Sequence, residues 1–313
     1  MNYIPFVKNS KEREALSGIL ILFGFLCLAF VLASILQAGM LFMNMMKEGN
    51  LDMEALGEGM NLLTSSRSGW WTLIWMQGLS SMILFIGTSL AYWSWMEKKR
   101  FSDFNSNAFP GVSTLLFVFL IQISFLPLNA LVTSWNEGLH LPEALKGLEA
   151  VMKEMERQAA EITEFLAKSD TIGQLLMNII VIGIIAGIGE ELLFRGLIQR
   201  KFIRVFGNYH LAIWAAAIIF SSIHFQFYGF FPRVLLGALF GYFYVWTGNI
   251  WVPILAHIFN NSLAVIMYHL VHKGIISKDF EKMDNIPLIY VALSTVIFAF
   301  LIYRFYPKNK ENV

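Results

Sequence analysis

The stretch Gly187–Gly196, which reads GIGEELLFRG, places two adjacent carboxylates and an arginine inside a long apolar run. An ionised side chain at the centre of a bilayer costs about 2.5–3.5 kcal/mol on insertion scales. Glu190 and Glu191 are the only glutamates well inside an apolar run of membrane-spanning length, and every aspartate falls in a connection or at a helix end. We therefore expect partners, a cavity, or both around these two acids.

The composition of the chain indicates a membrane protein around this stretch. Hydrophobic residues make up 57% of the 313 residues and charged residues only 14%, whereas soluble domains carry roughly 25% charged residues. The formal net charge of +1 gives no reason to expect a nucleic-acid partner. Cys27 is the single cysteine, so a disulfide framework and a cysteine-based metal site are excluded. The lipid bilayer is the expected surrounding.

Apolar runs of membrane-spanning length recur along the chain. A span needs about 20 mostly apolar residues, and the sequence predicts an all-α, polytopic protein with about eight: 16–43, 70–95, 111–132, 172–198, 209–228, 233–248, 250–270 and 286–305. The first run is longer than the roughly 7–15 apolar residues of a signal peptide, so we expect it to be a membrane span. We divide the chain into N-terminal helices (1–135), an extramembrane amphipathic helix (136–170), a four-helix catalytic core (171–271) and a final helix with its tail (272–313).

Basic residues indicate an orientation. Eight spans place both termini on one side, and tight clusters of Lys and Arg lie on that side at helix ends, among them 98–100 and 200–204. Loops on the cytoplasmic side of membrane proteins carry an excess of Lys and Arg. We therefore expect both termini in the cytoplasm, with the protein in the cell membrane, as a multi-pass protein of a bacterial inner membrane.

Residues 141–168 differ from the spans. Their apolar residues recur at alternating spacings of three and four, which is typical of an amphipathic helix. Two interpretations stay open, a surface helix packed on the bundle or the lipid headgroups, and a helix that gates the site or grips substrate. The pattern also predicts i,i+4 ion pairs and a capping box that opens the next helix: Glu149 with Lys153, Glu164 with Lys168, and Thr171 with Gln174.

Helix geometry separates the two acids of the opening stretch. Glu191 and Arg195 are four residues apart, so an ion pair within the helix can neutralise both. Glu190 is rotated by about 100° from Glu191, onto a face with Gly183 and Gly187, where another helix or water can approach. We expect Glu191 to be structural and Glu190 to take part in chemistry, near the middle of the bilayer.

Two later spans carry polar residues that could meet Glu190. His224 closes the run Phe220–His224, and His257 and Asn261 lie one turn apart on one helix face. Each could be structural, because buried histidine and asparagine also hydrogen-bond between membrane helices. Together with Glu190, however, two imidazoles can hold zinc with an open position for water. Alternatively, Glu and His activate water without a metal while His and Asn stabilise an oxyanion. Both arrangements describe the hydrolysis of an amide.

Three motifs in order resemble the signature of the CAAX protease and bacteriocin-processing family of intramembrane proteases. The resemblance covers about 172–270, roughly a third of the chain, and the first three helices and the 141–168 helix lie outside it. Its motifs are Glu-Glu-x-x-x-Arg (Glu190, Glu191, Arg195), Phe-x-x-x-His (Phe220, His224) and His-x-x-x-Asn (His257, Asn261).

The resemblance implies a role for each motif residue. Glu190 and His224 would activate the attacking water, and His257 with Asn261 would stabilise the oxyanion or contribute to metal binding. Glu191, Arg195 and Phe220 would support the site. The family leaves open a metalloprotease and a glutamate-dependent, metal-free protease, so Zn²⁺ is a candidate cofactor with Glu190, His224 and His257 as candidate ligands. The implied substrates are membrane-embedded or lipidated proteins and peptides.

Other membrane proteins fit the sequence less well. A rhomboid-type protease needs a Gly-x-Ser-Gly nucleophile in a span and a presenilin-type protease needs two membrane aspartates, and both features are absent from the sequence. The zinc-helix pattern HExxH is absent too. A proton-coupled transporter also uses buried Glu, His and Arg, but no inverted repeat is evident. A family member without catalysis, acting as a membrane partner, is the remaining alternative.

Overall fold

The computed structural model describes residues 12–49, 63–64, 67–277 and 287–306, and all regular structure in these ranges is helical. Seven helices of the described part are long and apolar enough to cross a membrane: Glu14–Glu48, Ser68–Met96, Val112–Glu137, Ile172–Phe206, Phe230–Thr247, Trp251–His272 and Leu288–Phe305. The chain is therefore an all-α, multi-pass membrane protein, as the apolar runs predict.

The elements follow one another in a simple order. The first span is α1 (Glu12–Glu48), and the second joins α4 (Arg67–Ser81), η1 (Met82–Gly87), α5 (Thr88–Ala91) and η2 (Tyr92–Met96). Then come η3 (Phe101–Phe104), α6 (Val112–Glu137), η4 (Glu143–Leu145) and α7 (Lys146–Ala167). The fourth span joins α8 (Ile172–Asn178), η5 (Ile179–Ile185), α9 (Ala186–Glu191), η6 (Leu192–Gln199) and α10 (Arg200–Phe206). The last elements are α11 (Tyr209–Ser222), α12 (Phe230–Thr247), α13 (Trp251–His272) and α14 (Leu288–Phe305).

The fifth expected span, 209–228, is shorter than its apolar run. The helix α11 has 14 residues, which is about 21 Å at 1.5 Å per residue and less than the roughly 30 Å hydrocarbon core. The chain turns after Ser222, where the amides of His224 and Phe225 donate to carbonyls three residues back. Phe225 has a left-handed φ of 52°, which α-helical geometry does not allow. The prediction of a helix through residue 228 is therefore wrong at its C-terminal end.

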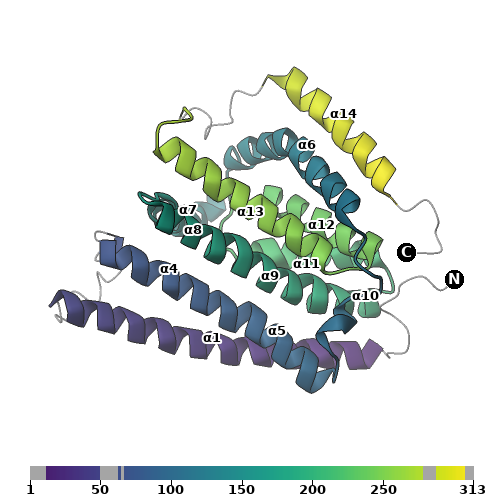
Figure 1. The fold of residues 1–313 in the computed structure, drawn as a ribbon, viewed down its shortest axis with the longest axis horizontal. Helices are drawn as coiled ribbons and strands as arrows, with labels where there is room; N and C mark the ends of the chain where they lie inside the picture. Colours follow the sequence, from purple (N-terminus) through teal and green to yellow (C-terminus); the bar gives the residue numbers. More distant parts are fainter. Residues whose placement is uncertain (1–11, 50–62, 65–66, 278–286, 307–313) are drawn as a thin grey trace.

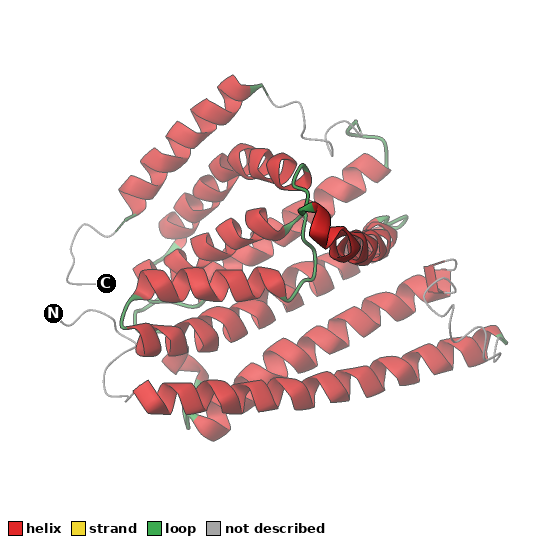
Figure 2. Ribbon diagram, turned by 180° about the vertical axis from the view of Figure 1, so that it is seen from behind, coloured by secondary structure: helices red, strands yellow, loops and turns green. Residues whose placement is uncertain are grey.

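The helices form three groups in Figure 1. On one side α1 packs against α4, and on the opposite side α14 packs against α6. The remaining long helices lie between these pairs, and the view from behind in Figure 2 shows the same order. In both views α1 begins and α14 ends at the same end of the bundle, because the short helix α11 adds an eighth pass to the seven long helices of the described part.

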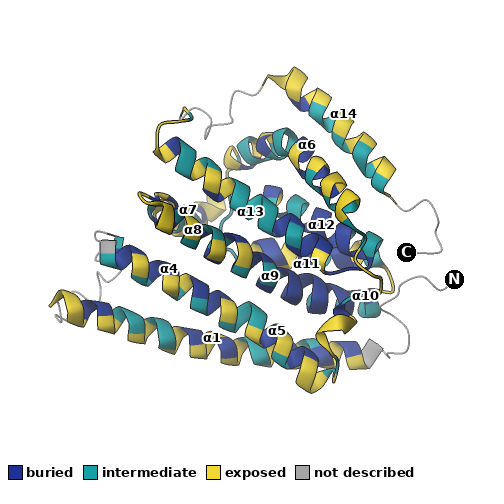
Figure 3. Ribbon diagram, in the orientation of Figure 1, coloured by how far each residue is buried: buried dark blue, intermediate teal, exposed yellow. Residues whose placement is uncertain are grey.

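Burial separates the centre of the bundle from its outer helices. Figure 3 shows buried residues concentrated in the middle helices, whereas α1 and α14 expose most of their surface. The exposed side chains of the outer helices are apolar, with Leu20 72% and Val296 68% exposed. Such a surface suits lipid, because lipid tails are as apolar as these side chains.

Wide helical turns flank the acidic pair. η5 precedes α9 and η6 follows it, and both are π-helical. Hydrogen bonds from residue i to i+5 are rare in helices and occur mostly as short bulges, often at functional sites. The acids at the end of α9 thus lie between two stretches in which the rotation per residue about the helix axis differs from that of an α-helix.

Glycines bring α13 against the fourth span. A Cβ added at Gly187 would lie 2.9 Å from the side chain of Ile258 and 3.1 Å from its backbone nitrogen. A Cβ at Gly183 would lie 2.5 Å from Ser262 Oγ. The absence of both side chains lets α13 contact the backbone beside Glu190, which confirms the expected approach of another helix.

Candidate active site

Glu191 and Arg195 form the ion pair that their spacing predicts. Arg195 donates from one terminal nitrogen to Glu191 Oε1 at 2.8 Å, and Arg195 is 1% and Glu191 0% exposed. The other terminal nitrogen of Arg195 donates to the carbonyl of Gly237 on α12 at 2.8 Å. The guanidinium also lies over the rings of Phe220 and Phe240, at 5.1 and 5.7 Å from their centroids. One buried pair therefore connects α9, η6, α11 and α12.

His257 lies between the two acids. Its Nδ1 is 2.7 Å from Glu191 Oε1, and its Nε2 is 3.6 Å from Glu190 Oε2. A carboxylate accepts hydrogen bonds, so we infer that Nδ1 carries the hydrogen and that Nε2 faces Glu190. Glu191 thus has a second function beside the ion pair, because it fixes the orientation of the imidazole that meets Glu190.

His224 has one ring nitrogen occupied and the other available. Its Nδ1 is 2.7 Å from the carbonyl oxygen of Phe220, and a carbonyl can only accept. Nδ1 therefore donates, and Nε2 of the neutral ring carries a lone pair. The Phe220 ring packs edge-on against His224 at 5.0 Å and against His257 at 6.1 Å. Phe220 thus packs against both imidazoles.

Asn261 ties α13 to the fourth span. Its Nδ2 donates to the carbonyl of Ile182 at 3.0 Å, and its Oδ1 accepts from Asn260 Nδ2 at 3.3 Å. The amide nitrogen has two hydrogens, so one N–H remains for another acceptor. Its position one turn after His257 places both residues on the same face of α13.

The predicted catalytic residues meet at one cavity of about 530 Å³. Pockets of roughly 300–1,000 Å³ that combine an apolar lining with a few polar groups are typical of ligand sites. The polar lining includes the four predicted catalytic residues and others, and the lining as a whole consists of Gln77, Asn129, Thr133, Ile162, Thr163, Leu166, Ile182, Ala186, Glu190, Phe220, His224, Gly229, Pro232, Arg233, Leu236, His257, Asn260 and Asn261.

The loop 223–229, which carries His224, is held from two sides. Asn136, at the end of α6, donates to the carbonyl of Phe227 and accepts from the amide of Phe231, both at 3.0 Å. From α7, Glu156 accepts from the amide of Tyr228 at 3.0 Å. These bonds fix the turn that replaces the missing part of the fifth span.

Glu149 forms a second contact between α7 and this loop. Its carboxylate accepts from the Tyr228 hydroxyl at 3.4 Å, and it pairs with Lys153 at 2.7 Å, as predicted. Hydrogen bonds from Lys153, His140 and the amide of Leu141 lower the pKa of Glu149 to about 2. The charged form of this carboxylate therefore joins α7 to the loop.

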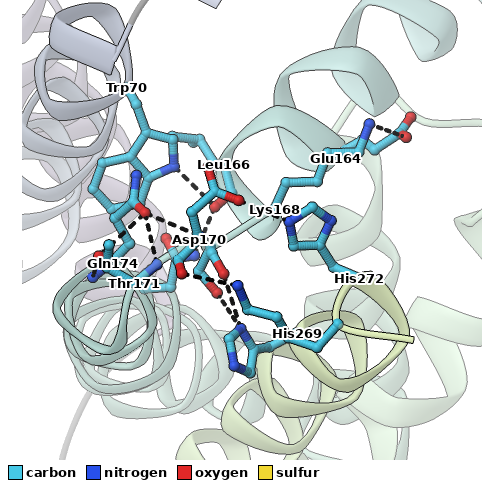
Figure 4. A network of polar contacts seen from close by, with 12 residues as sticks. Trp70, Glu164, Leu166, Lys168, Asp170, Thr171, Gln174, His269 and His272 are labelled. Atoms are coloured by element: carbon cyan, nitrogen blue, oxygen red, sulfur yellow. Dashed lines mark hydrogen bonds and ion pairs between the residues drawn. The ribbon is translucent and has the colours of Figure 1, made fainter. Parts of the chain in front are cut away.

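The C-terminal end of α7 is held by a separate set of contacts, which Figure 4 shows. The Leu166 carbonyl accepts from Trp70 Nε1 of α4 at 3.1 Å, and Asp170 pairs with His272 of α13 at 3.0 Å. The predicted capping box of Thr171 and Gln174 is present, and Glu164 pairs with Lys168 at 2.6 Å. The helix α7 therefore packs on the bundle, and Ile162, Thr163 and Leu166 face the cavity.

Sequence reasoning missed Arg233. This residue lies in the first turn of α12 and lines the cavity beside Glu190 and His224. Its charge at the start of a predicted span, 233–248, is a signal that could have identified it, because charges at membrane depth are rare and functional.

The three candidate zinc ligands are not grouped as a metal site in this geometry. Within the described residues, no group of three or more His, Cys, Asp or Glu side chains could hold a metal ion. His257 Nδ1 is occupied by Glu191, and His224 Nδ1 by the Phe220 carbonyl. The zinc set of Glu190, His224 and His257 stays a prediction, and no step proposed below depends on it.

Fold and site together define a class, a multi-pass membrane protein with a buried carboxylate, two imidazoles and an amide around one cavity. Residues 172–263 match the family described as "Type II CAAX prenyl endopeptidase Rce1-like". This segment covers the whole of α8 to α12 and the motif residues in α13. The similarity to the Rce1-like family is confined to this segment.

Two curated proteins of Bacillus subtilis (strain 168) are similar to part of the chain. "Putative membrane peptidase YdiL" is 33% identical over 98 residues, which are 31% of this chain and 40% of that protein. "Uncharacterized protein YpbD" is 29% identical over 99 residues, which are 30% of this chain and 48% of that protein. The chain thus matches less than half the length of either relative. No solved structure matches it.

Proposed function

We propose that the protein is an intramembrane endopeptidase that hydrolyses peptide bonds of membrane-associated or lipidated proteins. The observation that carries this proposal is the chain of contacts from Arg195 through Glu191 and His257 to Glu190, which ends at the cavity. A carboxylate and an oriented imidazole at a partly apolar cavity are groups that activate water. The family match over residues 172–263 and the name of the relative YdiL support the same activity.

In the proposed reaction, Glu190 and His224 activate water. The Glu190 carboxylate takes a proton as the water oxygen bonds to the scissile carbonyl carbon, and His224 Nε2 accepts a hydrogen bond from the same water. The carbonyl oxygen becomes an oxyanion, which the free N–H of Asn261 stabilises by a hydrogen bond. His257 adds a second donor in its doubly protonated form, in which Nδ1 stays bonded to Glu191 and Nε2 also carries a hydrogen. The C–N bond then breaks, and the proton held by Glu190 passes to the leaving amine.

Glu191 and Arg195 hold this arrangement together. Glu191 orients His257 and is itself neutralised by Arg195, so the second acid adds no net negative charge beside Glu190. We further propose that the protein is a multi-pass protein of a bacterial inner membrane with both ends cytoplasmic. The basic clusters 98–100 and 200–204 support this orientation.

Zinc remains a separate part of the proposal. A bound zinc ion would polarise the carbonyl or lower the pKa of water. Zinc content of the purified protein, measured together with activity after chelation, decides whether Glu190, His224 and His257 bind it. Full activity of a zinc-free sample would remove the metal from the account.

Membrane peptides compared between three cell lines test the proposed function. The first line carries the wild-type protein, the second Glu190→Gln, and the third, as the matched control, Glu143→Gln at an exposed position, all at the same abundance. We expect intact substrates to accumulate, and their fragments to disappear, only with Glu190→Gln. Identical peptide sets in all three lines would contradict proteolysis and favour a non-catalytic membrane partner.

A further inference from the structure

Arg233 has a guanidinium nitrogen that no described residue uses. One terminal nitrogen of Arg233 donates to Gln226 Oε1 at 2.6 Å. The other terminal nitrogen is buried and has no hydrogen-bond partner among the described residues. A buried donor that is left unsatisfied costs about 1–3 kcal/mol, and more for a charged group. An arginine held in this state at a cavity wall is therefore a candidate ligand-binding group.

The backbone provides room for this guanidinium. A Cβ added at Gly229 would lie 2.9 Å from the terminal nitrogen that bonds Gln226 and 3.7 Å from the free one. The φ of Gly229 is −102°, which any residue adopts, so its backbone conformation does not require glycine. The missing side chain instead leaves the space that the guanidinium fills.

The carboxylates around Arg233 do not neutralise it by contact. Glu156 of α7 and Glu190 act on its charge through space. Glu156 accepts from the Tyr228 amide, and Glu190 pairs with His257. Among the described residues, neither acid forms an ion pair with Arg233. The cavity thus has a cationic donor beside its catalytic groups.

We propose that Arg233 binds a carboxylate of the substrate peptide and so fixes which peptide bond reaches Glu190 and His224. The proposal rests on the proteolytic function above and names a recognition element within the same cavity. A guanidinium binds carboxylate through directed, charge-assisted hydrogen bonds. The carboxylate comes either from the C-terminus of the peptide or from an acidic side chain. Cleavage then occurs at a fixed distance from that group.

Binding of matched peptides to the full-length protein in proteoliposomes tests this. The probes are three fluorescent, N-palmitoylated decapeptides of Gly, Ala and Leu: one ends in a free carboxylate, one in a carboxamide, and one in a carboxamide with a glutamate at the ninth position. Glu190→Gln is the common background, so that binding is measured without cleavage. We expect roughly ten- to hundredfold tighter binding of a carboxylate peptide than of the plain amide.

The two carboxylate probes separate the sources. Preference for the free C-terminus shows a main-chain carboxylate, and preference for the glutamate peptide shows an acidic side chain. Arg233→Gln should abolish the preference and Arg233→Lys should restore part of it. Gly229→Ala should weaken it by displacing the guanidinium, with an unchanged melting temperature. Arg157→Gln, on the exposed face of α7, is the matched control and should keep the full preference.

Equal binding of all three peptides to the Glu190→Gln background protein would overturn the proposal before any change at Arg233 is tested. An equal loss for all peptides in Arg233→Gln would overturn it too, because a general structural role predicts that result. The outcome is separable from the proposed function. If the protein prefers carboxylate peptides but the wild type cleaves none, the binding site at Arg233 is supported and the proteolytic function is refuted. If cleavage depends on Glu190 but no carboxylate preference is found, the proteolytic function is supported and the role of Arg233 is refuted.

Discussion

Replacement of Arg195 by alanine should destabilise the protein more than any exposed charge change. The substitution leaves the Glu191 carboxylate, 0% exposed, without its cation. Breaking a buried ion pair by removing one partner typically costs about 3–5 kcal/mol, because the remaining charge is buried and uncompensated. The same change removes the hydrogen bond to the Gly237 carbonyl and the contacts with Phe220 and Phe240. We expect a loss of at least about 3 kcal/mol in the free energy of unfolding.

Reversible unfolding in mixed detergent micelles, followed by tryptophan fluorescence, measures this loss. Arg157→Ala is the matched control, because Arg157 also pairs with acids three and four residues away but is 55% exposed; we expect little change there. The double variant Glu191→Gln with Arg195→Gln should be more stable than the sum of its single losses predicts, because it leaves no unpaired charge. A loss below about 1 kcal/mol for Arg195→Ala, or full additivity in the double variant, would refute the reasoning.

Two further predictions concern packing and pH. Gly187→Ala should destabilise the protein by about 1–3 kcal/mol in the same unfolding assay, because its Cβ would lie 2.9 Å from the Ile258 side chain. Gly24→Ala is the control and should be neutral or stabilising, because a Cβ there would have nothing within 4 Å. Equal effects of the two substitutions on the free energy of unfolding would contradict this prediction. The pKa of Glu149, lowered to about 2 from 4.5, means that its contacts stabilise the docked α7 fully above about pH 5 and are lost as the pH falls toward 2. Hydrogen exchange at the Leu141 amide, which donates to Glu149 Oε2 at 2.9 Å, should rise over that window in the wild type, after correction for intrinsic rates, and stay flat in Glu149→Gln. The same profile in both proteins would exclude this role.

Local patterns were predicted from the sequence with the greatest success. The Glu191–Arg195 pair and the capping box after α7 depend only on helix geometry over three or four residues. The apolar runs likewise predicted eight spans from the thickness of the bilayer, and in the described residues seven of them are long helices while the fifth, Tyr209–Ser222, is shorter. These features need no knowledge of how the helices pack.

Contacts between helices were beyond the sequence. The bond of His257 to Glu191 requires α13 to lie against α9 at a particular rotation, and the wide turns of η5 and η6 alter that rotation. The sequence therefore suggested the members of the site but not that His257 lies between the acids. The pairing of Glu190 with His224 stays a prediction, with both residues at one cavity.

The early end of α11 had a similar cause. Residues 223–228 are largely apolar, so hydropathy extended the span, but Asn136 of α6 and Glu156 of α7 bind the loop in a turn. Arg233 escaped notice because a cation at the start of a predicted span resembles one that extends to the membrane surface. Its position at the cavity depends on that same turn.

The rate of peptide cleavage by Glu190→Gln tests the central claim most directly. The reconstituted variant is compared with the wild type at equal amounts of folded protein, on a substrate identified from the membrane peptides. A general base contributes about 10²–10⁴-fold to a rate, so we predict a loss of at least about a hundredfold with an unchanged melting temperature. Cleavage at the wild-type rate would contradict the assignment of Glu190 as the group that activates water.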